Sequence, residues 1–153
     1  MAGAFTGKGW QGPTLLGSVR GVSAAEARVR PGGLKHGVWD YVLHAAYWKY
    51  VVCLKLGAVE RDSFPRSPSN WPALPEAASA AADEKAWRAD VRLLKSYHEQ
   101  LVETVAGMDL SRMEEIPAGG KSVRLLDVLV GIAAHDAYHT GQIQVVKRLV
   151  RRK

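Results

Sequence analysis

The longest stretch of helical periodicity in the chain covers residues 80–106. Apolar and aromatic side chains recur there at spacings of three and four residues, which places them on one face of a helix. The members of this stripe are Trp87, Val91, Leu94, His98, Leu101 and Val105. Gly107 follows directly and is a common helix terminator. We therefore predict a long helix over residues 80–106 with one face toward a core.

Two further stretches also have the length and pattern of helices. Residues 37–56 are apolar on nearly every side, as expected of a helix that packs against several neighbours, and Gly57 ends the stretch. Residues 122–151 begin at Ser122, a good N-cap, and carry a second stripe. Its members are Leu125, Val128, Ile132, His135, His139, Gln142, Val146 and Leu149. Three or four long helices without a convincing strand pattern predict an all-α bundle.

The N-terminal part of the chain divides into short pieces. Residues 1–12 are rich in glycine, and we expect them to be loosely held. Pro13 fits the first turn of a short helix over residues 13–19. Ser23, with Glu26 three residues later, forms the pattern of a capping box and marks another short helical turn.

Two segments rich in proline and glycine separate the helical stretches. Residues 30–33 break the chain before the helix at 37–56. Residues 58–78 contain Pro65, Pro68, Pro72 and Pro75 and are predicted to form a loop. Loops of this length often border functional sites. The 153 residues fit one domain, so we expect a single helical-bundle domain over residues 1–153.

Composition and charge narrow the possible partners. Hydrophobic residues make up 47% of the chain and charged residues 24%, which is typical of a globular protein. The net charge is +6, and the dense basic run is Lys147, Arg148, Arg151, Arg152 and Lys153. No aromatic or glycine-rich element accompanies this run, as a strand-binding surface usually requires. These charges suit the negative end of the last helix dipole, and we expect no nucleic-acid partner.

Cysteine content and hydropathy bear on the compartment. The single cysteine, Cys53, lies among apolar residues, and we expect a buried structural thiol. A lone cysteine forms no internal disulfide, which favours a reducing compartment. No apolar run approaches the roughly 20 residues that cross a bilayer, and the first residues lack the pattern of a signal peptide. We therefore expect a cytoplasmic location and no membrane partner.

The most informative short motif is His135-Asp136-Ala137-Tyr138-His139. Two histidines four residues apart lie one turn apart on the same side of a helix. Neutral imidazoles carry lone pairs that can converge on one metal ion, at about 2.0–2.1 Å for zinc. The alternative is a pair of core histidines that are hydrogen-bonded to carbonyl groups or water.

The same motif matches the metalloprotease pattern His-Glu-x-x-His, with Asp136 in the glutamate position. Aspartate is shorter, and Asp136 lies about 100° round the helix from His135. Metalloproteases of that class usually take their third ligand from downstream, but residues 140–153 contain neither an acid nor a histidine. We therefore disfavour a protease.

A third metal ligand would have to come from upstream of the motif. His36 lies beside the start of its helix and is expected to be exposed. His44 lies in the middle of the most apolar helix, and His98 lies on the apolar stripe of residues 80–106. The pattern alone does not choose between His44 and His98, and each is also compatible with a hydrogen-bonded core histidine.

Several motifs resemble those of the DinB-like superfamily of metal-dependent four-helix-bundle proteins. The resemblance covers nearly the whole chain, and its most specific part is the segment from His135 to Ile143. The other matching motifs are Trp10-Gln11-Gly12-Pro13, Ser23-Ala-Ala-Glu26, the segment from Val38 to Trp48, and Asn70-Trp71-Pro72.

The resemblance implies a fold and a set of metal ligands. The fold is a four-helix bundle of up-down-down-up type. One histidine on the second long helix and two on the last would bind the metal, and these fall on His44, His135 and His139. His98 then becomes a core or rim histidine. The chain departs from the family by having Gln11 where histidine is frequent, and its first helix is expected to be short.

The resemblance also implies a chemistry. Three histidines leave a coordination position open, as in catalytic zinc sites, and zinc or nickel is expected, with iron or manganese also compatible. The candidates to orient the histidine rings are Asp40, Asp136, Tyr138 and Gln142. The expected activity is that of a thiol transferase or hydrolase on a small molecule, with a low-molecular-weight thiol as a possible partner. The alternative is a non-catalytic metal-binding stress-response protein, and a homodimer is possible in either case.

Overall fold

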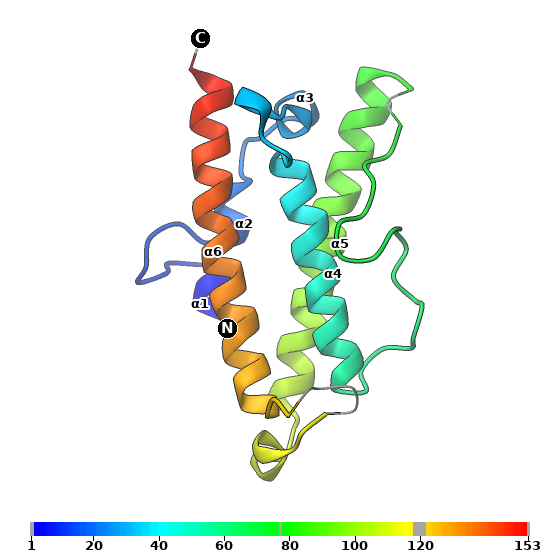
Figure 1. The fold of residues 1–153 in the computed structure, drawn as a ribbon, viewed down its shortest axis with the longest axis vertical. Coiled ribbons are helices and arrows are strands. Elements are labelled where there is room, and N and C mark those ends of the chain that lie inside the picture. The colour runs from blue at the N-terminus through cyan, green and yellow to red at the C-terminus, as the bar shows by residue number, and fades with distance from the viewer. Residues whose placement is uncertain (1, 77, 118–121, 153) are drawn as a thin grey trace.

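A computed structural model describes residues 2–76, 78–117 and 122–152 (Figure 1). Within these ranges the chain forms helices and no β-strand, so the all-α prediction is confirmed. The α-helices are α1 (Ala2–Phe5), α2 (Leu15–Ser18), α3 (Ala24–Arg28), α4 (Val38–Lys55), α5 (Ala80–Ala106) and α6 (Leu125–Arg151), and the 3₁₀ turns are η1 (Pro31–Gly33) and η2 (Leu110–Glu114). None of the described helices combines the length and apolar content that crossing a bilayer requires.

The three long helices pack side by side. Figure 1 shows that α4 and α5 run in the same direction and that α6 runs in the opposite one. The segment between α4 and α5 is long because the chain must return to the other end of the bundle before α5 begins. The short helices α1 and α2 pack on α6, where a fourth long helix would lie in a full bundle. The up-down-down-up order of four long helices therefore stays a prediction. The three long helices α4, α5 and α6 run down, down and up in Figure 1.

Most helix boundaries agree with the sequence pattern, but the start of α6 does not. The capping box before α3 is present, because Ser23 Oγ accepts from the Glu26 N–H and Glu26 Oε2 accepts from the Ser23 N–H. Ser122 was predicted to cap α6, and this prediction is wrong. Ser122 has a φ of 57°, outside the extended region that an N-cap residue adopts, and Arg124 holds the cap position instead.

The core consists of two apolar clusters along the bundle. In the first, Trp39 of α4 and Trp87 of α5 meet edge to face, with ring centroids 5.3 Å apart. In the second, Cys53 packs with Leu101 of α5 and Leu125 of α6. Cys53 is fully buried, as predicted, and burial raises the pKa of its thiol to about 11. This thiol is therefore protonated at neutral pH.

A buried ion pair joins α4 to α6. The Lys49 ammonium donates to both carboxylate oxygens of Asp136, at 2.6 and 2.8 Å, and the two side chains are 1% and 2% exposed. The ring of Phe5 lies 4.8 Å from the Lys49 nitrogen and stacks on His98, with centroids 3.6 Å apart. His98 is thus a buried histidine whose ring packs on Phe5. The N-terminal residues, which we expected to be loosely held, supply Phe5 to this layer.

Candidate metal centre

The packing of α4 against α6 brings three histidines together. His44 comes from the middle of α4, and His135 and His139 come from successive turns of α6. The Nε2 atom of His135 lies 3.1 Å from that of His44 and 3.0 Å from that of His139. Three ligand atoms, one from each ring, all lie within 4.8 Å of one another. Nitrogens bound tetrahedrally at zinc distances are roughly 3.3 Å apart, so the cluster has the size of a single-ion site.

The Lys49–Asp136 pair lies directly beside this cluster. Lys49 follows His44 by five residues on α4, and Asp136 is the neighbour of His135 on α6. Because the pair is buried and joins the two helices, it fixes their separation at the level of the histidines. The cluster therefore lies where a buried ion pair already joins the two helices that carry its histidines.

Hydrogen bonds set the orientation of two of the rings. His44 Nδ1 donates to the main-chain carbonyl of Asn70 at 2.6 Å, and His139 Nδ1 donates to Gln142 Oε1 at 2.6 Å. When its proton is on Nδ1, a neutral imidazole carries its lone pair on Nε2. The lone pairs of His44 and His139 therefore lie on the nitrogens nearest His135.

The surroundings of the third ring, His135, bear on whether a cation fits between the three histidines. His135 Nε2 lies near both of the other Nε2 atoms, and its buried Nδ1 has no hydrogen-bond partner among the described residues. A single proton on His135 Nε2 would point toward only one of the two neighbouring lone pairs. A cation between the rings would attract all three lone pairs at once, so the donor set suits a metal ion.

Burial keeps the three imidazoles in the form that binds metals. Desolvation lowers the pKa of His44 to about 4 and the pKa of His135 to about 3. The pKa of His139 is also lowered, chiefly by burial. All three rings are therefore neutral at pH 7, and no proton has to leave before they bind a cation.

The loop between α4 and α5 forms one wall of the site. The ring of Trp71 stacks on that of His44, with centroids 3.8 Å apart, and also on that of His36, at 3.7 Å. Trp48 Nε1 donates to the Asn70 side chain at 2.9 Å, which holds the loop against α4. His36 was expected to be exposed, but it is partly buried in this stack because the loop folds back over the start of α4. The loop borders the site, as its length indicated.

The two acidic candidates for orienting the rings are engaged elsewhere. Asp40 accepts from the Arg30 guanidinium and from the Gly37 N–H, so it secures the start of α4. Asp136 is bound to Lys49. Neither carboxylate has a hydrogen bond to a site histidine among the described contacts. Both side chains instead neutralise cations that help to hold the fold.

The other two candidates lie on the α6 side of the cluster. Gln142 contacts His139 directly through its side-chain oxygen. Tyr138 is 64% exposed, its ring lies 5.0 Å from that of His139, and its hydroxyl accepts from Gln142 at 3.3 Å. Sequence reasoning did not identify the carbonyl of Asn70 as a partner of His44, because a main-chain acceptor has no residue type of its own.

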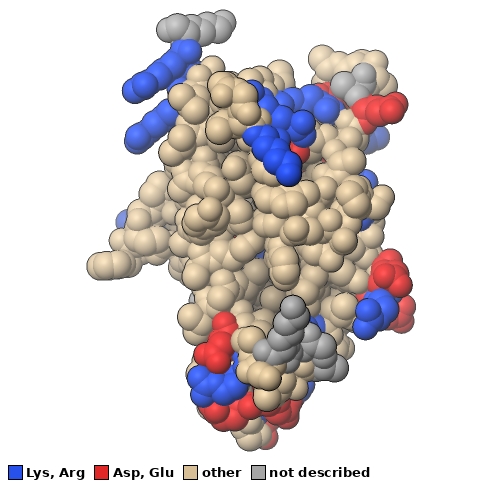
Figure 2. Space-filling view, in the orientation of Figure 1, with Lys and Arg blue, Asp and Glu red and all other residues tan. Residues whose placement is uncertain are grey.

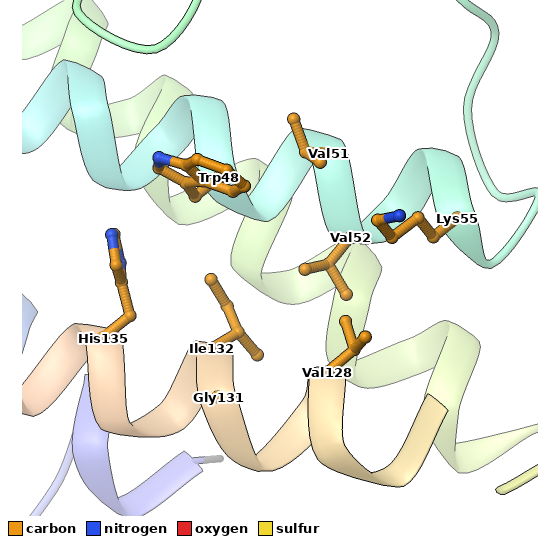
Figure 3. Close-up of a pocket in the computed structure, with 8 residues that line it drawn as sticks. All are labelled: Trp48, Val51, Val52, Lys55, Val128, Gly131, Ile132 and His135. Carbon is orange, nitrogen blue, oxygen red and sulfur yellow. The ribbon is translucent and has the colours of Figure 1, made fainter. Parts of the chain in front are cut away.

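A small apolar pocket opens beside the cluster, between α4 and α6. Its volume is about 220 Å³, and Figure 3 shows the His135 ring at one end, facing Trp48 across the gap. Lys55 lies at the other end. The remaining lining residues are apolar side chains and one glycine: Val51, Val52, Val128, Gly131 and Ile132. The pocket can hold an apolar group next to His135.

Comparison with known protein families supports the relationship that the motifs indicated. The sequence model of the DinB superfamily matches residues 10–143. The chain belongs to the DinB superfamily. In this DinB-superfamily protein the matched span contains His44, His135 and His139 as well as the loop residues Asn70 and Trp71. No curated protein and no solved structure matches the chain.

The contact between Gln142 and His139 leads to a first prediction. We expect Gln142→Ala to weaken zinc binding by about 10–100-fold, because the His139 ring loses the acceptor that fixes its orientation. Competition with a chromogenic chelator measures the affinity. Gln144→Ala, which removes the same side chain from α6 two residues further on, is the matched control and should bind zinc like the parent. Equal affinities of Gln142→Ala and the parent would show that the hydrogen bond does not orient the ring.

Proposed function

We propose that His44, His135 and His139 hold one divalent metal ion, and that this DinB-superfamily protein is a metal-dependent enzyme for a small molecule. The observation that carries the proposal is the convergence of three neutral imidazoles, one nitrogen from each ring lying within 4.8 Å of the others, with His135 Nε2 close to the Nε2 atoms of both His44 and His139. All-nitrogen ligation suits zinc or nickel, and it is also compatible with iron or manganese. Three protein ligands leave a coordination position open for a reactant.

When bound, the ion would act as a Lewis acid and lower the pKa of a thiol or water ligand. The chain supplies the surroundings of that chemistry. Trp71 covers His44 and limits access of water from the loop side. The apolar pocket next to His135 would receive an apolar part of the substrate. The site would thus bind a small molecule with one reactive end and one apolar end.

Of the two expected chemistries, transfer of a low-molecular-weight thiol has the better support. A free thiol loses its proton with a pKa of about 8.5, whereas that of bulk water is about 15.7. The carboxylates nearest in sequence to the histidines, Asp40 and Asp136, are both paired with cations. A thiol therefore needs less help from a general base than water does, which favours a transferase over a hydrolase.

Metal content tests the first half of the proposal. We expect one metal ion per chain in the purified protein by elemental analysis, and its loss in His44→Ala and in His139→Ala. His98→Ala removes a buried histidine outside the cluster and should retain the metal. If the parent takes up no metal after reloading with zinc, nickel and manganese, the three-histidine site is refuted.

Turnover tests the second half. The metal-loaded protein would be screened with low-molecular-weight thiols and electrophilic acceptors, and separately with esters and amides. We expect thiol consumption that disappears in His139→Ala. If the protein holds its metal but converts none of these substrates, the proposed enzymatic activity is contradicted. That result would instead support a structural metal that only joins α4 to α6.

A further inference from the structure

The two ends of the pocket between α4 and α6 differ in charge. His135 and Trp48 stand at one end, and burial keeps His135 neutral at pH 7. The side chains between the two ends are uncharged, and Lys55 stands at the other end (Figure 3). Of the residues that line the pocket, Lys55 alone therefore carries a charge at neutral pH.

The Lys55 ammonium is available to a ligand. Figure 3 shows its side chain extending from the end of α4 back toward Val52, so that the nitrogen lies on the pocket side. Among the described residues, no carboxylate forms an ion pair with Lys55. A cation without a counter-charge at the end of an apolar pocket attracts an anion that has an apolar body.

Gly131 keeps the opposite wall of the pocket open. A glycine inside a helix destabilises it relative to alanine, so its presence in the middle of α6 calls for a reason. A Cβ added at Gly131 would have no heavy atom outside the adjoining backbone within 4 Å, so close packing does not require the glycine. The space that a side chain would fill is instead part of the pocket.

The pocket is long and narrow. Seven residues separate Trp48 from Lys55 on α4 and Val128 from His135 on α6. At a rise of 1.5 Å per residue, the two ends are about 10 Å apart along the helices. The volume is about 220 Å³, so the occupant has to be slender. An unbranched chain fits these dimensions better than a ring system does.

The surroundings of the pocket do not repel an anion. In Figure 2 the charged side chains gather at the two ends of the molecule and along one edge. The middle of this face, where α4 and α6 lie side by side, is nearly free of them. Trp48 is 36% exposed, so the pocket reaches the surface on its α4 side.

We propose that the pocket binds an unbranched apolar carboxylate, with the carboxylate group on Lys55 and the far end of the chain beside His135. One ammonium balances the single charge of a carboxylate, whereas a phosphate group carries about −1.5 to −2. The inference rests on the proposed function for the reaction at the metal, and it names the class of substrate: a carboxylic acid whose reactive group lies at the end remote from the carboxylate. Lys55 is then a specificity-determining residue.

Calorimetric titration of the metal-free protein with octanoate, in the presence of a chelator, tests the proposal. We expect a dissociation constant of about 1 mM or tighter, and at least tenfold weaker binding of octanamide, which has the same shape without the charge. Lys55→Met should weaken octanoate at least tenfold and leave octanamide unchanged. Lys95→Met, which removes an exposed lysine of α5 outside the pocket, is the matched control and should bind octanoate like the parent.

Filling the pocket locates the bound chain. Gly131→Leu should abolish the binding of both probes without lowering the melting temperature, because leucine is a better helix former than glycine and its Cβ meets open space. A parent protein that binds no octanoate would overturn the proposal, and so would a Gly131→Leu variant that binds it normally. Equal octanoate affinities of Lys55→Met and the parent would also overturn it, since Lys55 would then only complement the negative end of the α4 dipole.

The two proposals fail separately because this titration needs no metal. Octanoate binding through Lys55 in a protein that takes up no metal would refute the proposed function and leave the carboxylate site in place. Metal uptake and turnover in a protein that ignores octanoate would do the reverse. In the metal-loaded enzyme, electrophiles with a terminal carboxylate should have a lower KM than their amides, and Lys55→Met should remove this difference without lowering kcat.

Discussion

Replacing Lys49 by methionine is expected to lower the free energy of unfolding by about 3–5 kcal/mol. The substitution leaves the Asp136 carboxylate, which is 2% exposed, without its counter-charge inside the bundle. Burial already raises the pKa of Asp136 in spite of the lysine, so the carboxylate depends on Lys49 to stay ionised. Chemical denaturation monitored by circular dichroism measures the change.

Two further variants isolate the cause of this loss. Lys55→Met makes the same change on the same helix at a less buried position and should cost much less. Replacing both partners, with Lys49→Met and Asp136→Leu together, should recover much of the stability, because no unpaired charge remains. If Lys49→Met costs no more than Lys55→Met, the ion pair does not hold α4 to α6 in the way that the structure indicates.

Saturating zinc is expected to stabilise the parent protein by about 4 kcal/mol when free zinc exceeds the dissociation constant 1,000-fold. The gain follows because the ion binds the folded chain, in which His44 of α4 meets two histidines of α6, and not the separated ligands of the unfolded chain. Thermal unfolding with zinc and with a chelator measures the difference. His44→Ala should abolish the gain, whereas His98→Ala should retain it. A zinc-induced gain in His44→Ala equal to that of the parent would place the metal elsewhere.

Acidification is expected to destabilise the metal-free protein below pH 6.5. Burial lowers the pKa of His44 from 6.5 to about 4 and that of His135 from 6.5 to about 3. A depressed pKa means that the unfolded chain binds protons more tightly, so the contribution to stability is complete above pH 6.5 and is lost as pH falls toward these values. Denaturation curves between pH 4 and 8 would show this slope, and His135→Ala should flatten it. A slope that is unchanged in the variant would assign it to other groups.

The helices could be predicted from the sequence because their stability rests on stripes of apolar residues that the sequence displays directly. The bounds predicted for α5 agree with the structure, and α4 differs by one residue at each end. The start of α6 was harder, because a serine side chain caps a helix only when its own backbone is extended. The backbone of Ser122 is in the left-handed region, which a residue type does not reveal.

Part of the candidate site could be predicted from the sequence. Helical spacing alone pairs His135 with His139. It could not separate His44 from His98, because both lie on apolar faces and only the packing shows that His44 meets α6 while His98 meets Phe5. The resemblance to the DinB superfamily made that choice.

The surroundings of the histidines depend on residues that compete for the same partners. Asp136 is adjacent to His135 in sequence, yet it pairs with Lys49, because a buried ammonium has a greater need of a carboxylate than a neutral imidazole has. Asp40 binds Arg30 and the start of α4 for a similar reason. The oxygen that accepts from His44 is the main-chain carbonyl oxygen of Asn70. The path of the loop sets the position of this oxygen, and the side chain of Asn70 does not.

Because Cys53 is buried, this protein is suited to assays of thiol consumption and to labelling at an introduced cysteine. A sulfhydryl that is inaccessible and keeps its proton at neutral pH consumes neither alkylating reagents nor electrophilic substrates while the chain stays folded. Any sulfur that disappears from an assay mixture would then come from the added cosubstrate. A cysteine introduced at the surface would be the single reactive position of the folded chain, so a fluorophore or spin label could be attached there without first removing the native one.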